Sequence, residues 1–147
     1  MAQKCPDLPI NQVFNDDCTP QFLDWIEAIQ VVGFSTLDIT GYSPLNEWVF
    51  FHVESQTLII TDLAYYFDAS SSPTIQLATK LLGGYQQLRP SFLEKIATRD
   101  QVQVKQSIQQ ILAWDFNRVI MAHGSILEQD AKLQFQQGYE WFLGEKL

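Results

Sequence analysis

The chain has 147 residues, with 17 acidic and 9 basic side chains and a formal net charge of −8, and this length suits one domain spanning residues 1–147. Hydrophobic residues make up 46% of the sequence and charged residues 18%, a composition that disfavours intrinsic disorder. No apolar run reaches the ~18 residues of a membrane span, and the acidic balance disfavours binding to nucleic acid.

The first half of the chain has the features of strands. Residues 25–32 mix apolar and polar side chains as a half-buried strand does, and Gly33 and residues 41–44 interrupt the pattern. Residues 47–53 and 57–63 are rich in β-branched and aromatic side chains. Only Glu54, Ser55 and Gln56 separate these two segments, so they predict an antiparallel hairpin.

The second half alternates helices with one strand. Residues 74–82 and 101–114 have helical periodicity, and residues 118–122 are a short apolar strand. The final segment predicts a helix that starts at Ser125 and places five side chains on one stripe: Leu127, Ala131, Phe135, Tyr139 and Phe142. A crossover from residues 57–63 to 118–122 should be parallel and right-handed. The predicted class is therefore α+β, a mixed sheet with helices on one face.

Two strands deliver polar side chains at their ends. Asp62 follows residues 57–61, and His123 follows residues 119–122. If these strands are parallel, both side chains emerge at the C-terminal edge of the sheet, where open α/β sheets place ligands. The two groups could share a metal ion or act as a base and its orienting group, or Asp62 could cap a turn while His123 shapes a strand exit.

The hairpin determines which other residues lie near Asp62. The strand 47–53 runs opposite to 57–63, so its start lies at the Asp62 end, together with Tyr42, Asn46 and Glu47. His52 lies near the hairpin turn, about 15 Å from Asp62 at the usual rise per strand residue. We therefore do not expect His52 to belong to the site.

Two further features favour structural roles. Residues 69–105 hold five basic and two acidic side chains, which could recruit an acidic partner, although a solvated helix face is the favoured interpretation. The bases are Lys80, Arg89, Lys95, Arg99 and Lys105. Trp114, Tyr139 and Trp141 are expected in the core rather than in a ligand platform.

The segments from Thr40 to Phe67 and from Trp114 to Gly124 carry a resemblance to a known family. The first contains LNEWVFFH and TLIITDL, and the second is WDFNRVIMAHG. Together they resemble the metallo-β-lactamase superfamily, and in particular an uncharacterised branch of it, a domain of unknown function, over residues from about Pro6 to Leu147. The order and spacing of the two strand-end motifs carry the resemblance.

The resemblance implies one half of an αββα sandwich and a degenerate metal site. Asp62 falls where the superfamily has its metal-bridging aspartate, and His123 falls where it has its last histidine ligand. Tyr42 stands in place of the histidine of the preceding turn. The His-x-His-x-Asp-His cluster of the N-terminal half is missing, so the sequence resembles the C-terminal half alone.

This ligand set determines the expected function. Catalytic zinc sites use at least three protein ligands, and Asp62 and His123 supply two. We therefore expect no cofactor and a non-catalytic or vestigial protein that acts through self-association or a partner chain. The alternatives are a metal-dependent hydrolase completed by ligands from another chain, which would hold zinc or another divalent metal weakly, and a truncated gene remnant.

The resemblance also predicts how the chain associates. In a half sandwich, the sheet face without helices lacks its second sheet, and large apolar residues of the strands would be exposed there: Ile26, Val32, Trp48, Phe50 and Val53. We expect a homodimer, or a complex with a partner half-domain, through that face. Residues 1–9 lack the features of a signal peptide, and the two cysteines, Cys5 and Cys18, are too few for a disulfide framework, so a cytoplasmic location is expected.

Overall fold

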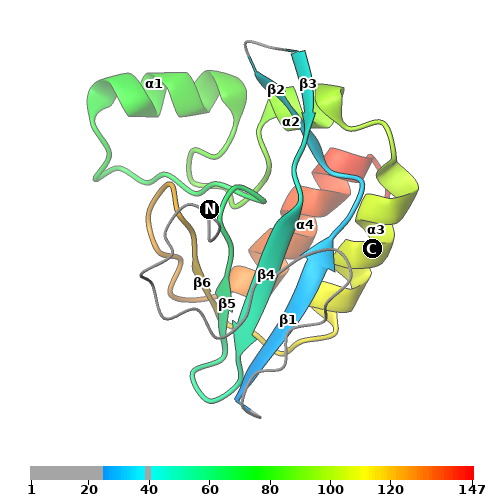
Figure 1. Cartoon of the computed structure of the whole chain (residues 1–147). Coiled ribbons are helices and arrows are strands. Elements are labelled where there is room, and N and C mark those ends of the chain that lie inside the picture. The colour runs from blue at the N-terminus through cyan, green and yellow to red at the C-terminus, as the bar shows by residue number, and fades with distance from the viewer. Residues whose placement is uncertain (1–24, 39–40) are drawn as a thin grey trace, which may run out of the picture.

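The computed structural model describes residues 25–38 and 41–147, and its main feature is a four-stranded mixed sheet (Figure 1). The strands lie in the order β1 (Ile26–Val31), β4 (Glu47–His52), β5 (Thr57–Ile59) and β6 (Arg118–Ile120). Adjacent pairs are antiparallel except β5 and β6, which are parallel. The predicted α+β class is confirmed.

The predicted hairpin and the predicted parallel pairing of the crossover strands both form. In the hairpin, His52 pairs with Thr57, so residues 53–56 make the turn. In the parallel pair, Leu58 lies beside Val119, and both are completely buried. Both crossover strands are shorter than expected, because β5 ends at Ile59 and β6 at Ile120.

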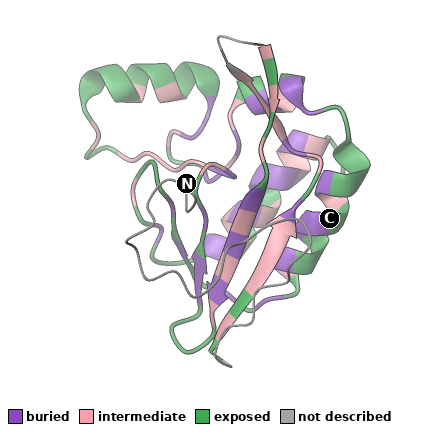
Figure 2. Ribbon diagram, viewed as in Figure 1, coloured by how far each residue is buried: buried purple, intermediate pink, exposed green. Residues whose placement is uncertain are grey.

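The core lies between the sheet and two helices, α3 (Gln101–Leu112) and α4 (Ala131–Leu143), which cover one face (Figures 1 and 2). Strand β4 alternates accordingly: Val49 and Phe51 are buried, whereas Trp48 and Phe50 are half-buried. On α4, the predicted stripe is confirmed for four members, all completely buried: Ala131, Phe135, Tyr139 and Phe142.

The predicted start of the last helix is wrong. Helix α4 begins at Ala131 rather than Ser125. Leu127 instead exchanges two backbone hydrogen bonds with Val119, at 2.9 and 3.1 Å. Leu127 therefore pairs with the edge strand of the sheet. This pairing, and not a helix, is the reason that Leu127 is buried.

Three elements have no counterpart in the predictions. Strands β2 (Ser35–Asp38) and β3 (Gly41–Pro44) form a separate two-stranded sheet, and α2 (Phe92–Ala97) follows the break at residues 82–90. Ser91 and Glu94 form a reciprocal capping box at the start of α2. The buried Glu94 also accepts a hydrogen bond from Thr36 Oγ1 at 3.0 Å, which joins α2 to β2.

Helix α1 (Pro73–Leu82) forms where predicted but lies apart from the layered body (Figure 1). Ser72 caps its first turn, and none of its residues is buried (Figure 2). In the part of the chain that the structure describes, no helix has the length and apolarity needed to cross a membrane.

Candidate functional site

The ends of β5 and β6 bring Asp62 and His123 together. The parallel register aligns Ile59 with Ile120, and the segments that follow these two residues reach the same edge of the sheet. Asp62 Oδ1 lies 3.6 Å from His123 Nε2, and the two side chains are 40% and 67% exposed. The juxtaposition predicted from the crossover is therefore present, in an open and solvated position.

Glu47 lies beside this pair but is engaged elsewhere. Its two carboxylate oxygens accept the backbone N–H groups of Thr61 and Asp62, the latter at 2.9 Å. Burial raises the pKa of Glu47, while these hydrogen bonds act in the opposite direction. The carboxylate thus fixes the chain at the end of β5, and both oxygens are used in doing so.

His52 lies at the opposite end of the hairpin, as expected. It pairs with Thr57 at the start of β5, and its Nδ1 lies 2.8 Å from Ser55 Oγ in the turn. Its ring also makes an edge contact with Trp25 at a centroid distance of 5.4 Å. These contacts assign His52 to the turn and not to the Asp62–His123 pair.

Tyr42 has a partner of its own. It lies in β3 opposite Leu37, and the guanidinium of Arg99 sits 4.7 Å above its ring centroid. The ring is 57% exposed. Its assignment to the place of a histidine ligand stays a prediction, as does any role for Asn46, which is exposed after β3.

The chemistry available to the pair follows from the number of its ligand atoms. Across residues 25–38 and 41–147, no group of three or more His, Cys, Asp or Glu side chains is arranged to hold a metal ion. Asp62 and His123 alone offer one carboxylate and one imidazole, fewer than a catalytic zinc site uses. In water such a pair can exchange a proton or hold a divalent ion weakly.

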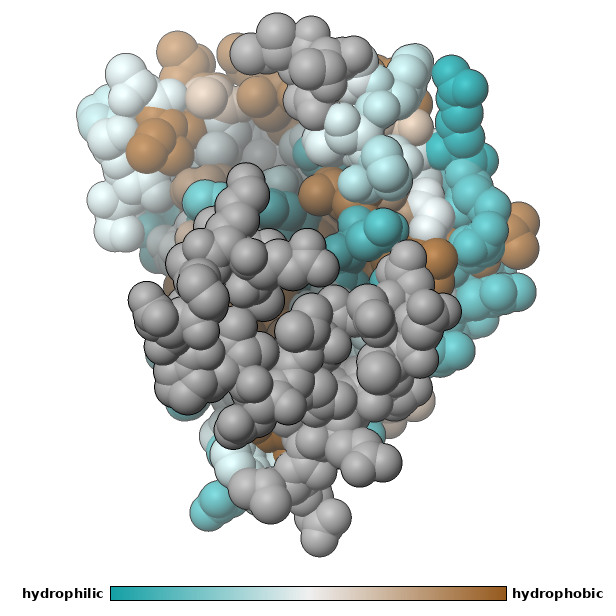
Figure 3. Space-filling view, viewed as in Figure 1, coloured by the Kyte–Doolittle hydropathy of each residue, from teal (hydrophilic) through white to brown (hydrophobic). Residues whose placement is uncertain are grey.

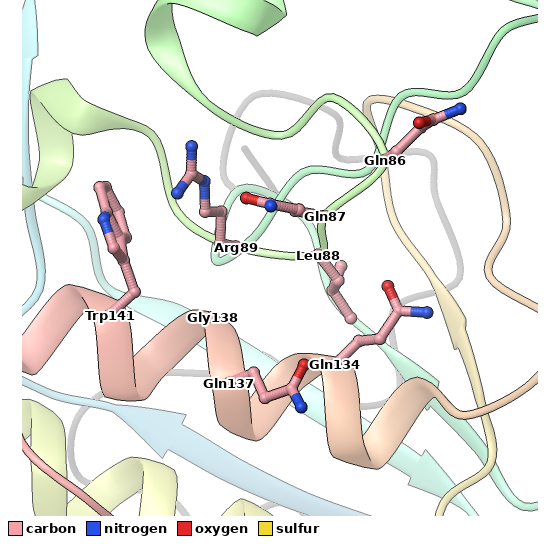
Figure 4. Close-up of a pocket in the computed structure, with 8 residues that line it drawn as sticks. All are labelled: Gln86, Gln87, Leu88, Arg89, Gln134, Gln137, Gly138 and Trp141. Carbon is pink, nitrogen blue, oxygen red and sulfur yellow. The ribbon is translucent and has the colours of Figure 1, made fainter.

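A second feature was missed by the sequence predictions. A pocket of about 530 Å³ lies between residues 86–89 and α4, and its lining includes Arg89 and Trp141 (Figure 4). Trp141, expected in the core, is only half-buried and forms a wall of this pocket. The available signal was the excess of basic residues between 69 and 105.

No protein-family model matches the sequence, and no curated protein matches it. The relationship to the metallo-β-lactamase superfamily therefore remains a prediction that rests on the motifs around Asp62 and His123.

Proposed function

We propose that this chain is a non-catalytic protein that acts through self-association, and that its Asp62–His123 pair is the remnant of a metal site. The observation that carries the proposal is the orientation of α1. This helix turns its polar side toward the protein and its apolar side toward solvent, the reverse of a helix that belongs to a core.

The polar side of α1 makes the contacts with neighbouring segments. The Gln76 amide donates to the carbonyl oxygens of Ala69 and Ser71, at 3.1 and 2.8 Å. Tyr85 lies on the same side, because its hydroxyl is 3.4 Å from Gln76 Oε1 and Lys80 Nζ is 4.5 Å above its ring. Within the part of the chain that the structure describes, the apolar stripe of α1 is therefore left exposed.

That stripe contains four large side chains, and hydrophobic residues mark the surface over α1 in the space-filling view (Figure 3). Their exposed fractions are 42% for Ile75, 64% for Leu77, 77% for Leu81 and 44% for Leu82. A contiguous patch of large, exposed apolar side chains marks an interaction site in soluble proteins.

The amount of apolar surface fits a second copy of the chain. The four exposed side chains of the α1 stripe supply part of the ~800 Å² that each partner of a standard interface buries. Helix α2, at the same end of the sheet as α1 (Figure 1), leaves three further apolar side chains about half exposed: Phe92, Leu93 and Ile96. Two copies meeting through both helices would cover seven large apolar side chains of each chain in a symmetric contact.

The proposed dimer differs from the one expected through the sheet face opposite the helices. Trp48 and Phe50 are half-buried on that face. The sheet-face contact stays a prediction, and a partner half-domain is its alternative occupant. The surface of α1 and α2 is the one on which the proposal rests.

A double substitution on α1 tests the proposal. Leu77→Glu with Leu81→Glu places two charges in the stripe, whereas Val102→Glu with Leu133→Glu places the same charges on exposed positions of α3 and α4. We expect the first pair to abolish association in sedimentation equilibrium and the control pair to retain it. Equal association of both double variants would overturn the assignment of the surface.

A second candidate is a metal-dependent hydrolase completed by another chain. The 3.6 Å separation of Asp62 and His123 at an open edge favours it, because two ligands are already placed there. In that case, zinc titration of the associated species would show one tightly held ion per site. Asp62→Ala or His123→Ala would remove that ion, whereas weak and unsaturated binding contradicts the hydrolase.

A further inference from the structure

Two cations that have no acidic partner among the described residues lie at the pocket between residues 86–89 and α4: Arg89 lines it, and Lys95 lies against Trp141 in its wall. The Arg89 guanidinium lies 4.3 Å from the ring centroid of Trp141 (Figure 4). The Lys95 ammonium lies 4.5 Å from the same centroid. In contrast, Lys105, Arg118 and Lys146 form ion pairs with glutamates. Among the described residues, neither Arg89 nor Lys95 has such a pair.

Arg89 is held in this position by its surroundings. Its backbone exchanges hydrogen bonds with Tyr65, at 3.0 and 3.2 Å, and its side chain passes close to Gly83. A Cβ atom on Gly83 would lie 3.1 Å from Arg89 Nε, so a residue without a side chain makes room for the guanidinium. Its buried Nε has no hydrogen-bond acceptor.

Lys95 and α4 complete this arrangement. Lys95 Nζ donates to the backbone carbonyl of Trp141, which holds the second cation beside the first. Gly138 lets the loop lie directly on α4, because a Cβ atom there would be 2.1 Å from the carbonyl oxygen of Leu88. The pocket is therefore a packed junction with defined walls.

The electrostatics of the junction favour an anion. Burial lowers the pKa of Arg89, and burial and the Arg89 charge together lower the pKa of Lys95, so both cations lie in a position that is unfavourable for positive charge. No acidic side chain lines the pocket, and four neutral amides do: Gln86, Gln87, Gln134 and Gln137. Amides can donate to oxyanion oxygens and also bond hydroxyl groups of an attached neutral moiety.

We propose that this pocket binds a small polar molecule through an oxyanion, a phosphate or carboxylate group held by Arg89 in the lining and by Lys95 beside Trp141. A guanidinium and an ammonium that lack acidic partners provide the charge-assisted donors that such a group requires. The volume of about 530 Å³ accommodates a metabolite-sized ligand. The proposal does not depend on the self-association of α1.

Isothermal titration with inorganic phosphate and with succinate, at ionic strength held constant with sodium chloride, tests the proposal. We expect saturable binding of at least one of the two anions. Arg89→Gln or Lys95→Gln should weaken it by about tenfold or more, as expected for loss of a charged hydrogen bond. Phosphate alone binding assigns a phosphoryl ligand, succinate alone assigns a carboxylate, and both together assign a general oxyanion site.

Arg99→Gln is the matched control, because it removes one positive charge from a cation that lies over Tyr42 and outside the pocket lining. It should leave the affinity within about twofold of the unmodified chain. If Arg89→Gln lowers the melting temperature strongly, the variant Lys95→Gln, at a half-buried position, decides the result. Absence of saturable binding, or an equal loss of affinity in Arg99→Gln, overturns the proposal.

Discussion

The buried carboxylate of Glu47 accepts the backbone N–H of Asp62 at 2.9 Å, and it thereby fixes the strand end that carries the exposed Asp62 side chain. Two acidic residues in contact thus have separate tasks. Glu47 satisfies backbone donors beneath the surface, and Asp62 faces His123 above it. This division explains how a strand end keeps a defined shape while its polar side chains remain in water.

The first prediction concerns pH and Glu47. Burial raises the folded-state pKa above the ordinary value of 4.5, so over the interval between the two values the folded chain holds a proton that the unfolded chain has released. The contribution of Glu47 to the free energy of unfolding must therefore fall as pH rises through that interval.

Urea unfolding of the unmodified chain and of Glu47→Gln, measured at a series of pH values upward from about 4.5, checks this prediction. The stability advantage of the unmodified chain should shrink with rising pH. Glu54→Gln, at an exposed position in the hairpin turn, corrects for the loss of one negative charge. An advantage that grows with pH would show that the hydrogen bonds of Glu47 outweigh its burial.

The second prediction concerns Tyr139, which is completely buried and donates its hydroxyl to the carbonyl oxygen of Leu63 at 2.7 Å. Tyr139→Phe keeps the ring but removes the donor, so we expect a loss of about 1–2 kcal/mol in the free energy of unfolding. Tyr85→Phe is the control, because the Tyr85 hydroxyl makes only a 3.4 Å contact with Gln76 and is partly exposed. The control should stay within about 0.5 kcal/mol.

The third prediction concerns Gly138 in α4. Replacing glycine by alanine inside a helix ordinarily stabilises it by up to ~1 kcal/mol. Here the new methyl group would lie 2.1 Å from the carbonyl oxygen of Leu88, so Gly138→Ala should instead destabilise the chain by about 1–3 kcal/mol. Gln137→Ala, on the exposed side of the same helix, serves as the reference. A stabilised Gly138→Ala would mean that the loop does not lie against α4.

Local patterns in the sequence predict the hairpin of β4 and β5 because its pairing depends on residues that are close in the sequence. The turn at residues 53–56 is short and flanked by β-branched and aromatic segments, which leaves a hairpin as the simple solution. One crossover between parallel strands then places Asp62 and His123 at the same edge. The hairpin and the crossover both follow from the direction of each strand and from its alternation of side chains, and both can be read from the sequence.

The features that were missed depend on contacts between distant segments. Periodicity identifies α1 as amphipathic but cannot show that Gln76 faces the protein and Leu81 faces solvent. Leu127 has the spacing of a helical stripe, yet pairing with Val119 determines its conformation. The pocket depends on the approach of Arg89 to Trp141, which are far apart in the sequence. In its local sequence, Arg89 has the pattern of a solvated charge, and Trp141 has that of a core aromatic residue.

The fourth prediction concerns metal. Because Asp62 and His123 provide two ligands, the purified chain should retain less than one zinc, iron or manganese ion per chain after dialysis, as measured by mass spectrometry of the elements. Asp62→Ala and His123→Ala should each change the free energy of unfolding by no more than about 0.5 kcal/mol, because both side chains are exposed. One tightly held ion per chain would favour the hydrolase.

The central claim, association of the chain through its outward-facing apolar surface, is tested most directly by the mass of the unmodified protein in solution. Multi-angle light scattering across a concentration series should give a mass that rises from 16.9 kDa toward 33.8 kDa, twice the mass of one chain. The rise should occur at micromolar concentrations, because the burial of the apolar side chains of α1 and α2 must offset the translational and rotational freedom that two chains lose on association. A monodisperse species of 16.9 kDa at high micromolar concentration would contradict the account.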